Sequence, residues 1–151
     1  MWGQAGLPRE IGQGRWIKEE MMPTWQEVGQ DNFRAAVELY ESGRHRRAVS
    51  RFYYAVFSVV TDELLRRNAK IDFRDNRATP SHSQLPNLME RYLTHFSVDR
   101  QTHLRNYVRN VYRDRIGADY LLLRVDKQSA KETYRATEKV FRYLGVFHGE
   151  K

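Results

Sequence analysis

The sequence contains no cysteine, and this absence excludes several classes of protein at once. Disulfide scaffolds, thiol nucleophiles and thiolate zinc sites all require cysteine. Long apolar runs are absent as well, because no segment approaches the roughly 18 consecutive apolar residues of a membrane span. The N-terminus carries charges and lacks the apolar core of a secretory signal. We therefore expect a cytoplasmic protein that does not enter a membrane.

Motifs of the common enzyme classes are missing too. There is no Gly-x-Ser-x-Gly turn of the hydrolase type and no Gly-x-x-x-x-Gly-Lys phosphate loop. We therefore expect neither a metal site nor a cofactor. The five histidines show no His-x-x-x-His spacing and no glutamate-flanked pair: they are His45, His82, His95, His103 and His148.

Basic residues, by contrast, are in excess. The net charge is +7, and arginine supplies 20 of the 26 basic residues. Residues 44–115 contain 15 basic and 7 acidic residues, so they carry the whole excess. Arginine grips phosphate with a planar fork of donors, and such a basic region indicates a polyanionic partner, nucleic acid first. The alternative is a surface that is basic only to remain soluble.

The chain is long enough for one ordinary domain. Residues 1–24 hold 4 of the 9 glycines and no sustained apolar period, so we expect a flexible leader there. Residues 25–147 are expected to form the folded domain, and residues 148–151 a C-terminal tail. No stretch alternates apolar and polar residues as a half-buried strand would, so we expect no strands.

Helical spacing of apolar residues begins early in the predicted domain. Apolar side chains recur at i, i+3, i+4 and i+7 from Phe33 to Tyr40, which predicts an amphipathic helix. Asp31 is the expected N-cap, and Gly43 is the expected stop signal.

A second helix is predicted at residues 44–68, and it is apolar nearly all round at 52–60. A helix of that kind is buried on several sides, so we expect it at the centre of the fold. With the other patterns it predicts an all-α, up-and-down bundle of about five helices. The remaining helices are expected at 81–96, from residue 99, and at 126–144, with irregular stretches at 69–80 and 116–125.

Two groups of arginines are candidates for binding a phosphate backbone. Basic residues fill the start of the second predicted helix at 44–47, where the helix dipole disfavours cations. Arginine also recurs every four residues along the fourth helix. Alternatively, Glu38 and Glu41 neutralise the first group, and the second is an ordinary solvated helix face. The candidate phosphate-binding residues are Arg47, Arg51, Arg105, Arg109 and Arg113.

Two short motifs resemble those of the HEPN superfamily. Residues 50–57, Ser-Arg-Phe-Tyr-Tyr-Ala-Val-Phe, resemble the branch whose second long helix carries Arg-x-Tyr-Tyr-Ala-x-Phe. Residues 115–120, Arg-Ile-Gly-Ala-Asp-Tyr, match its Arg-x-x-Ala-Asp-Tyr segment. Gly43 before the second helix and the Ser-His segment at 81–85 agree with the same branch. The resemblance runs over about residues 31–144.

The resemblance implies an α-helical bundle that commonly forms a homodimer. Many such proteins are metal-independent ribonucleases with an Arg-x(4–6)-His motif at the dimer interface, while others are non-catalytic modules. Many are encoded with a small nucleotidyltransferase as a toxin–antitoxin pair. In the ribonucleases an RNA 2′-hydroxyl attacks the adjacent phosphate, histidine moves the proton, and arginine holds the developing charge.

This chain departs from the family pattern at the catalytic histidine. Arg115 is followed at that spacing by Tyr120, whose ordinary pKa near 10 makes it a poor general base at pH 7. Ser58 also stands where that branch often has histidine. Two other pairs fit the spacing formally: Arg77 with His82, and Arg142 with His148.

We therefore expect a HEPN-like RNA-binding or RNA-cleaving toxin component, paired with a nucleotidyltransferase antitoxin. The first alternative is a non-catalytic scaffold that binds a nucleotide or a partner protein. The second is a basic bundle that binds DNA without sequence preference.

The candidate catalytic residues are Arg115, Asp119 and Tyr120. An Arg115–Asp119 ion pair at helical spacing would orient the guanidinium. Tyr120 would then donate to a phosphate oxygen, or accept a nucleotidyl group from a partner enzyme as the resemblance implies. Alternatively, the ion pair only ends the fourth helix, and Tyr120 packs inward.

Overall fold

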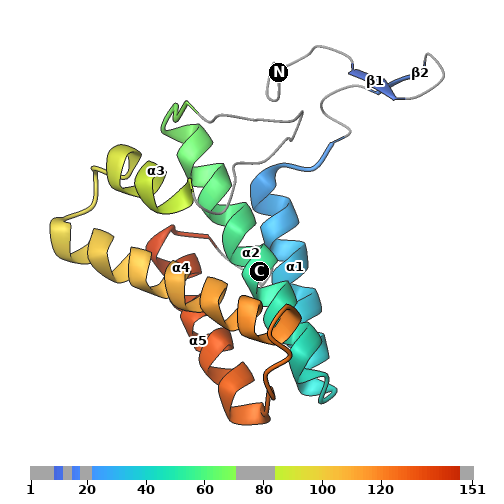
Figure 1. The fold of residues 1–151 in the computed structure, drawn as a ribbon. Helices are drawn as coiled ribbons and strands as arrows, with labels where there is room; N and C mark the ends of the chain where they lie inside the picture. The colour runs from blue at the N-terminus through green and yellow to red at the C-terminus, as the bar shows by residue number, and fades with distance from the viewer. Residues whose placement is uncertain (1–8, 12–14, 18–21, 71–83, 147–151) are drawn as a thin grey trace.

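Five helices make up most of the described chain, and Figure 1 shows their arrangement. The computed structural model describes residues 9–11, 15–17, 22–70 and 84–146. The predicted all-α bundle of about five helices is confirmed. The helices are α1 (Trp25–Glu41), α2 (His45–Arg66), α3 (Leu85–Tyr92), α4 (Val98–Asp119) and α5 (Lys127–Tyr143).

Helix α2 is the centre of the bundle, as its sequence predicts, and it packs against all four other helices. Figure 1 shows α1 running antiparallel beside α2, with α4 crossing them. Every residue from Phe52 to Val60 is buried except Tyr54. Burial of each large apolar side chain stabilises the fold by about 1.5–3 kcal/mol, so this segment anchors the other helices.

A cluster of aromatic rings joins α1, α2 and α5. Phe33 on α1 meets Phe52 on α2 with ring centroids 5.8 Å apart, in an edge-to-face arrangement. Tyr134 on α5 lies 4.9 Å from Phe52 and 5.7 Å from Phe33. Such pairs add about 0.5–1.5 kcal/mol each beyond their buried area, so the cluster fixes how these helices pack.

The predicted start of the first helix is wrong. The helix begins at Trp25, and Asp31 lies inside it. Thr24 is the N-cap: its hydroxyl accepts a hydrogen bond from the Glu27 backbone at 3.1 Å, and the Glu27 carboxylate accepts one from the Thr24 backbone at 2.8 Å. This reciprocal capping box satisfies two donors that a helix start leaves unpaired. Gly43 follows the helix with φ +82°, in agreement with its predicted role.

Helix α3 is shorter than the predicted 81–96, because it ends at Tyr92. Pro86 lies in its first turn, where its missing backbone donor costs no hydrogen bond, and residues 71–83 lie outside the described part of the chain. The chain then turns into α4, whose N-cap is Ser97: its hydroxyl accepts a hydrogen bond from the Arg100 backbone at 3.2 Å. The new helix therefore starts at Val98, directly before the predicted Asp99.

The predicted break at residue 116 is also wrong, because α4 continues to Asp119. Gly117 is buried there, and a Cβ atom at this position would approach Leu123 Cδ1 to 3.1 Å. The helical spacing of apolar residues is interrupted here because small residues of the helix pack closely against the chain that follows. Helix α5 lies within its predicted span of 126–144. Asp126 is its N-cap, and Gly145 follows the helix with φ +68°.

A short antiparallel hairpin precedes the bundle, although no strands were expected from the sequence. Its strands are β1 (Arg9–Ile11) and β2 (Arg15–Ile17), in a register that pairs Arg9 with Ile17. Three-residue strands are too short to show a period of two, which is why the pattern did not reveal them. The predicted flexible leader at 1–24 stays a prediction, and the tail at 148–151 lies outside the described residues. Among the described residues, no helix has the length and apolar character needed to cross a membrane.

Candidate functional site

Arg115 lies near the end of α4 and is buried, with 7% of its surface exposed. A buried charge is stable only when it is paired and hydrogen-bonded. The Arg115 Nε donates to the Asp119 Oδ2 at 3.1 Å, one turn further along the same helix. The predicted ion pair is therefore present, and it directs the guanidinium towards α2.

Helix α2 supplies the second side of this site. The Ser50 hydroxyl donates to the same Asp119 oxygen at 3.0 Å. The Arg115 Nη2 donates to the Tyr54 hydroxyl at 3.1 Å. Ser50 and Tyr54 are four residues apart on a helix, so they lie on one face of α2. Arg115 and Asp119 together thus link the end of α4 to the first half of α2.

Tyr120 closes the site from the solvent side. The Arg115 Nη2 also donates to the Tyr120 hydroxyl, at 3.2 Å. Tyr120 is 64% exposed and Tyr54 is 39% exposed, so Tyr120 does not pack inward. Each phenol oxygen accepts from the guanidinium, which leaves its own hydrogen free to donate to another acceptor.

Three tyrosine rings surround the guanidinium. Its central carbon lies 5.1 Å from the Tyr53 ring centroid, 5.4 Å from that of Tyr54 and 5.0 Å from that of Tyr120. These distances are within the range of cation–π attraction. We call this set of residues, Arg115 with Tyr53, Tyr54, Tyr120 and Asp119, the tyrosine cage.

The cage alters the pKa of two of its members, Arg115 and Tyr53. Burial alone would lower the Arg115 pKa, but Tyr54 and the hydrogen bond to Asp119 outweigh it and raise that pKa. Burial raises the pKa of the Tyr53 phenol well above its ordinary value, and Arg115 offsets only part of this effect. The site is therefore a fixed cation beside the hydroxyls of two exposed tyrosines, a combination suited to holding an anion.

The predicted phosphate-binding residues of α2 lie beside this site. Arg47 and Arg51 are exposed; Arg51 directly follows Ser50, and Arg47 lies three residues before it. The Arg51 Nη1 donates to the Asn32 Oδ1 of α1 at 3.1 Å. Arg47 borders a wide recess at the start of α2, together with Arg44, His45 and Arg46.

The neighbouring Arg46 has a structural role. Its guanidinium donates to the backbone carbonyl of Ala118, and also to that of Leu123 at 2.6 Å. These bonds satisfy carbonyls at the end of α4 and in the chain after it. Arg46 therefore attaches the beginning of α2 to the same end of α4 that carries the tyrosine cage.

The three predicted arginines of α4 do not share one surface. Arg105 and Arg109 line a pocket between α3 and α4, and Arg105 donates to the Glu90 carboxylate at 3.2 Å. Arg113 borders a different recess, between the end of α4 and α5. The predicted stripe is therefore divided between two places on the molecule.

Each histidine in the described residues has a neighbour outside the tyrosine cage. His45 lies beside the Tyr40 ring, with centroids 5.8 Å apart. The His95 Nε2 lies 3.6 Å from the Glu63 carboxylate, and the His103 Nδ1 lies 3.3 Å from the Tyr143 hydroxyl. His82 and His148, the partners in the two formal Arg-x(4–6)-His pairs, lie outside the described residues. In the described segments, no His, Asp and Glu side chains gather in a group that could hold a metal ion.

Sequence reasoning did not assign Tyr54 and Ser50 to the site. Both belong to the 50–57 motif, but Tyr54 was counted as part of an apolar core segment. The available signal was chemical: a tyrosine in a helix buried on several sides needs a partner for its hydroxyl or a route to solvent. Here it has both, because its hydroxyl meets Arg115 and its ring is partly exposed.

Comparison with known families agrees with the fold. A search of curated proteins gave no match. A family model, the HEPN domain, matches residues 22–147 of the 151-residue chain. The matched range contains all five described helices and every residue of the tyrosine cage. Because it spans most of the chain, the protein belongs to the HEPN domain family.

Proposed function

We propose that this HEPN protein binds RNA and that the tyrosine cage holds one of its phosphate groups. The observation that supports this proposal is the convergence of the hydroxyls of two exposed tyrosines, Tyr54 and Tyr120, on the buried, positively charged Arg115. A phosphate oxygen between Tyr54 and Tyr120 would accept both of their hydroxyl hydrogens. The guanidinium behind them would stabilise its negative charge.

Neighbouring arginines extend this site into a surface for a longer anion. Arg47, Arg51 and Tyr54 recur at helical spacing along α2, so they lie on one side of the helix. Both arginines are exposed. An RNA strand that enters the cage would therefore pass further basic side chains, whose phosphate contacts are largely independent of sequence.

Binding is better supported than cleavage. Cleavage needs a group that takes the proton from the 2′-hydroxyl. Tyr120 occupies the place of the family's histidine, and Asp119 is already engaged by Arg115 and Ser50. The second candidate, an RNA-cleaving toxin, would therefore need a proton acceptor in addition to the cage residues.

A nucleotidyltransferase antitoxin remains part of the proposal. The exposed Tyr120 hydroxyl is placed for modification by such a partner. Its oxygen would attack the α-phosphorus of a nucleoside triphosphate, forming a phosphodiester and releasing pyrophosphate. Modification would remove one hydroxyl donor from the cage and add a negative charge, so it would weaken RNA binding. Such a pair would act in the cytoplasm, where we place this protein.

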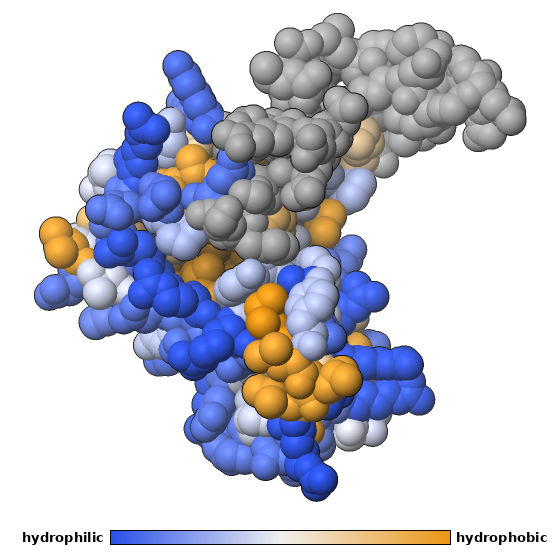
Figure 2. Space-filling model, in the orientation of Figure 1, coloured by the Kyte–Doolittle hydropathy of each residue, from blue (hydrophilic) through white to orange (hydrophobic). Residues whose placement is uncertain are grey.

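A homodimer is also part of the proposal. Residues Leu121, Leu122 and Leu123 follow Tyr120 and are all exposed. Figure 2 shows the resulting apolar area over the C-terminal end of α4. A contiguous apolar patch on a protein surface commonly marks an interface. We assign this patch to a second copy of the chain, because such a contact would bring two tyrosine cages together.

The test is RNA binding by purified protein in EDTA, measured by fluorescence anisotropy with a labelled single-stranded RNA. The double variant Tyr54→Phe, Tyr120→Phe keeps the rings and removes only the hydroxyls. It should bind about tenfold or more weakly. The matched control, Tyr107→Phe, changes a half-buried tyrosine elsewhere on α4 and should leave affinity unchanged. Equal affinity in the double variant would refute a phosphate site at the cage.

Two further measurements distinguish RNA binding without cleavage from RNA cleavage. Arg47→Ala should reduce the slope of log affinity against log salt by about one. A denaturing gel of the same RNA after incubation then separates binding from cleavage, because products in EDTA would show a metal-independent ribonuclease. An intact RNA that binds with a steep salt dependence would support the non-cleaving version.

A further inference from the structure

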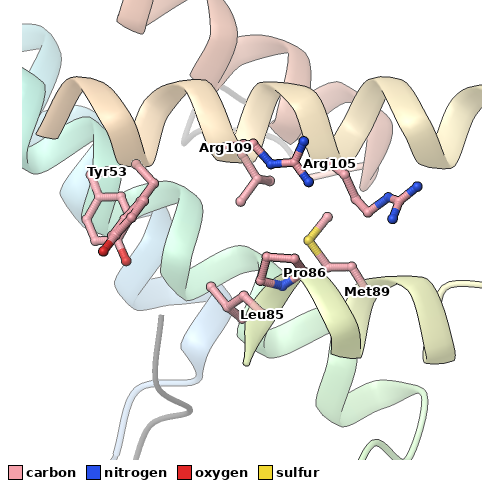
Figure 3. A pocket seen from close by; sticks show the side chains of 8 residues that line it. Tyr53, Leu85, Pro86, Met89, Arg105 and Arg109 are labelled. Carbon is pink, nitrogen blue, oxygen red and sulfur yellow. The ribbon is translucent and has the colours of Figure 1, made fainter. Parts of the chain in front are cut away.

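A compact pocket lies between α3 and α4, separate from the exposed hydroxyls of the tyrosine cage. Its volume is about 280 Å³, just below the lower end of pockets that hold drug-sized ligands. Figure 3 shows Arg105 and Arg109 on the α4 side, Leu85, Pro86 and Met89 on the α3 side, and Tyr53 at one end. Val108 and Tyr112 complete the lining.

The lining of the pocket favours a ligand with an apolar group. Leu85, Met89 and Val108 are buried core residues, and each presents only carbon or sulfur from its side chain. Two aromatic rings add flat surface, since Tyr53 and Tyr112 lie 5.7 Å apart between centroids. A flat or branched hydrocarbon group would gain burial against these walls.

The two arginines of the pocket, Arg105 and Arg109, favour a ligand that also carries an anionic group. Within the described part of the chain, the Arg105 Nε is buried and has no hydrogen-bond partner. A buried donor left unpaired is costly, so an acceptor bound in the pocket would satisfy it. Arg109 lies four residues further along α4, on the same helix face, and is exposed.

The charge balance indicates which anion fits. Glu90 accepts from the Arg105 Nη1 at 3.2 Å and neutralises one of the two arginines. The pocket and its rim therefore have one unit of positive charge in excess. A carboxylate carries one negative charge at neutral pH, whereas a phosphate monoester carries nearly two. One excess positive charge matches the carboxylate.

We propose that this pocket binds a small monocarboxylate with an aromatic or branched apolar body. The carboxylate is held by Arg105 and Arg109, and the body lies against the α3 side and the two tyrosines. This site goes beyond the proposed RNA binding, and binding of its ligand is measured by a different assay. It shares one residue with the cage, because the Tyr53 ring also stacks on Arg115. Occupancy will therefore be visible at the Arg115 Nε–H group as well as in the pocket.

The test is a titration of the full chain with phenylacetate, followed by ¹H–¹⁵N NMR spectra. Phenylacetate should shift the resonances of pocket residues and of the Arg115 side chain. Phenylacetamide has the same shape without the charge and should bind at least about tenfold more weakly. Acetate has the charge without the ring and should produce no saturable shift at the same concentrations.

Three variants test the assigned roles. Arg109→Gln should weaken phenylacetate binding by about tenfold. Glu90→Gln removes the competing carboxylate from Arg105 and should tighten binding several-fold. The matched control, Arg91→Gln, removes an exposed arginine at the end of α3 that does not line the pocket, and it should leave binding unchanged.

Three results would overturn the proposal. Equal binding of phenylacetamide would show an apolar pocket without a carboxylate site. Stronger binding of phenyl phosphate than of phenylacetate would show a phosphate site, and no saturable shift with any probe would show that the pocket takes no such ligand. None of these results depends on RNA, so RNA affinity measured on the same preparations tests the proposed function separately.

Discussion

Arg115 and Tyr120 are joined by a hydrogen bond of 3.2 Å across a steep change in solvent exposure. The arginine is buried, while the tyrosine is the first residue after α4 and is mostly exposed. Arg115 thus links two helices and also supplies the positive charge of an accessible site. Substitutions of the arginine and of the tyrosines should therefore have different consequences.

Replacement of Arg115 should destabilise the fold. Arg115→Ala removes the link to Tyr54 and leaves Asp119 with Ser50 alone. Hydrogen bonds to charged groups contribute about 1.5–3 kcal/mol each. Arg115 donates three of them, so the free energy of unfolding in urea should fall by at least about 1.5–3 kcal/mol. Arg115→Lys keeps the charge without the planar fork, and we expect an intermediate loss.

The matched control for this prediction is Arg113→Ala. Arg113 is exposed on the neighbouring turn of α4, and its loss should change the free energy of unfolding by less than about 0.5 kcal/mol. Equal stability of Arg115→Ala and the wild-type protein would show that the guanidinium does not tie the helices together.

The contact between α1 and α2 should be intolerant of one added methyl group. A Cβ atom at Gly29 would lie 2.5 Å from the Val59 Cγ1 and 3.2 Å from the Ala55 carbonyl oxygen. Gly29→Ala should therefore lower the free energy of unfolding by about 1–3 kcal/mol, as overpacking does. Val59→Ala removes the nearest atom, so the double variant should lose less than the sum of the two single losses. Additive losses in urea titrations would contradict this account of the contact.

Asp114 makes stability depend on pH. Burial raises the pKa of its carboxyl, and the Thr133 hydroxyl, which donates to it at 2.8 Å, and Arg113 offset only part of this effect. A carboxyl whose folded pKa is raised favours folding at low pH, and this contribution is lost as pH rises through the folded pKa.

At pH 7 the ionised Asp114 therefore destabilises the fold. Asp114→Asn keeps an oxygen that accepts from Thr133, so its melting temperature should exceed that of the wild-type protein at pH 7. The difference should close towards pH 4, near the ordinary pKa of aspartate. Asp99→Asn, in the first turn of α4, should lower the melting temperature at pH 7 because it removes a favourable charge at a helix N-terminus. A difference for Asp114→Asn that is constant with pH would show that its charge does not affect folding.

Much of the fold was predictable because it depends on local pattern. The apolar run at 52–60 indicated the central helix, and Gly43 marked the end of the first helix correctly. The start of α1 was misplaced although the Thr24-x-x-Glu27 box was present in the sequence. The continuation of α4 past Gly117 depends on a close contact with Leu123, which helical spacing does not reveal.

Only the part of the candidate site that depends on local pattern was predictable. Arg115 and Asp119 are one helical turn apart, so their pairing follows from spacing alone. The contacts of Arg115 with Tyr54, and of Asp119 with Ser50, join residues 61 and 69 positions apart. They exist only because α2 and α4 pack together, and no local pattern encodes that arrangement.

The apolar patch after α4 leads to a prediction about assembly. Leu122 is 76% exposed, and its φ of +52° places it in the left-handed region that bulky residues rarely adopt. Asparagine tolerates this conformation and is polar. Leu122→Asn should therefore leave the monomer at least as stable as the wild-type chain while weakening the proposed homodimer.

Sedimentation velocity over a concentration series measures the dimer, and thermal unfolding at low concentration measures the monomer. The dissociation constant of Leu122→Asn should rise by about tenfold, the loss expected for an apolar side chain buried at an interface. The matched control is Val98→Asn, because Val98 is 78% exposed and lies at the opposite end of α4. It should leave association unchanged. A wild-type chain that sediments as a monomer at every concentration would refute the dimer, and equal association of both variants would place its interface elsewhere than at Leu122.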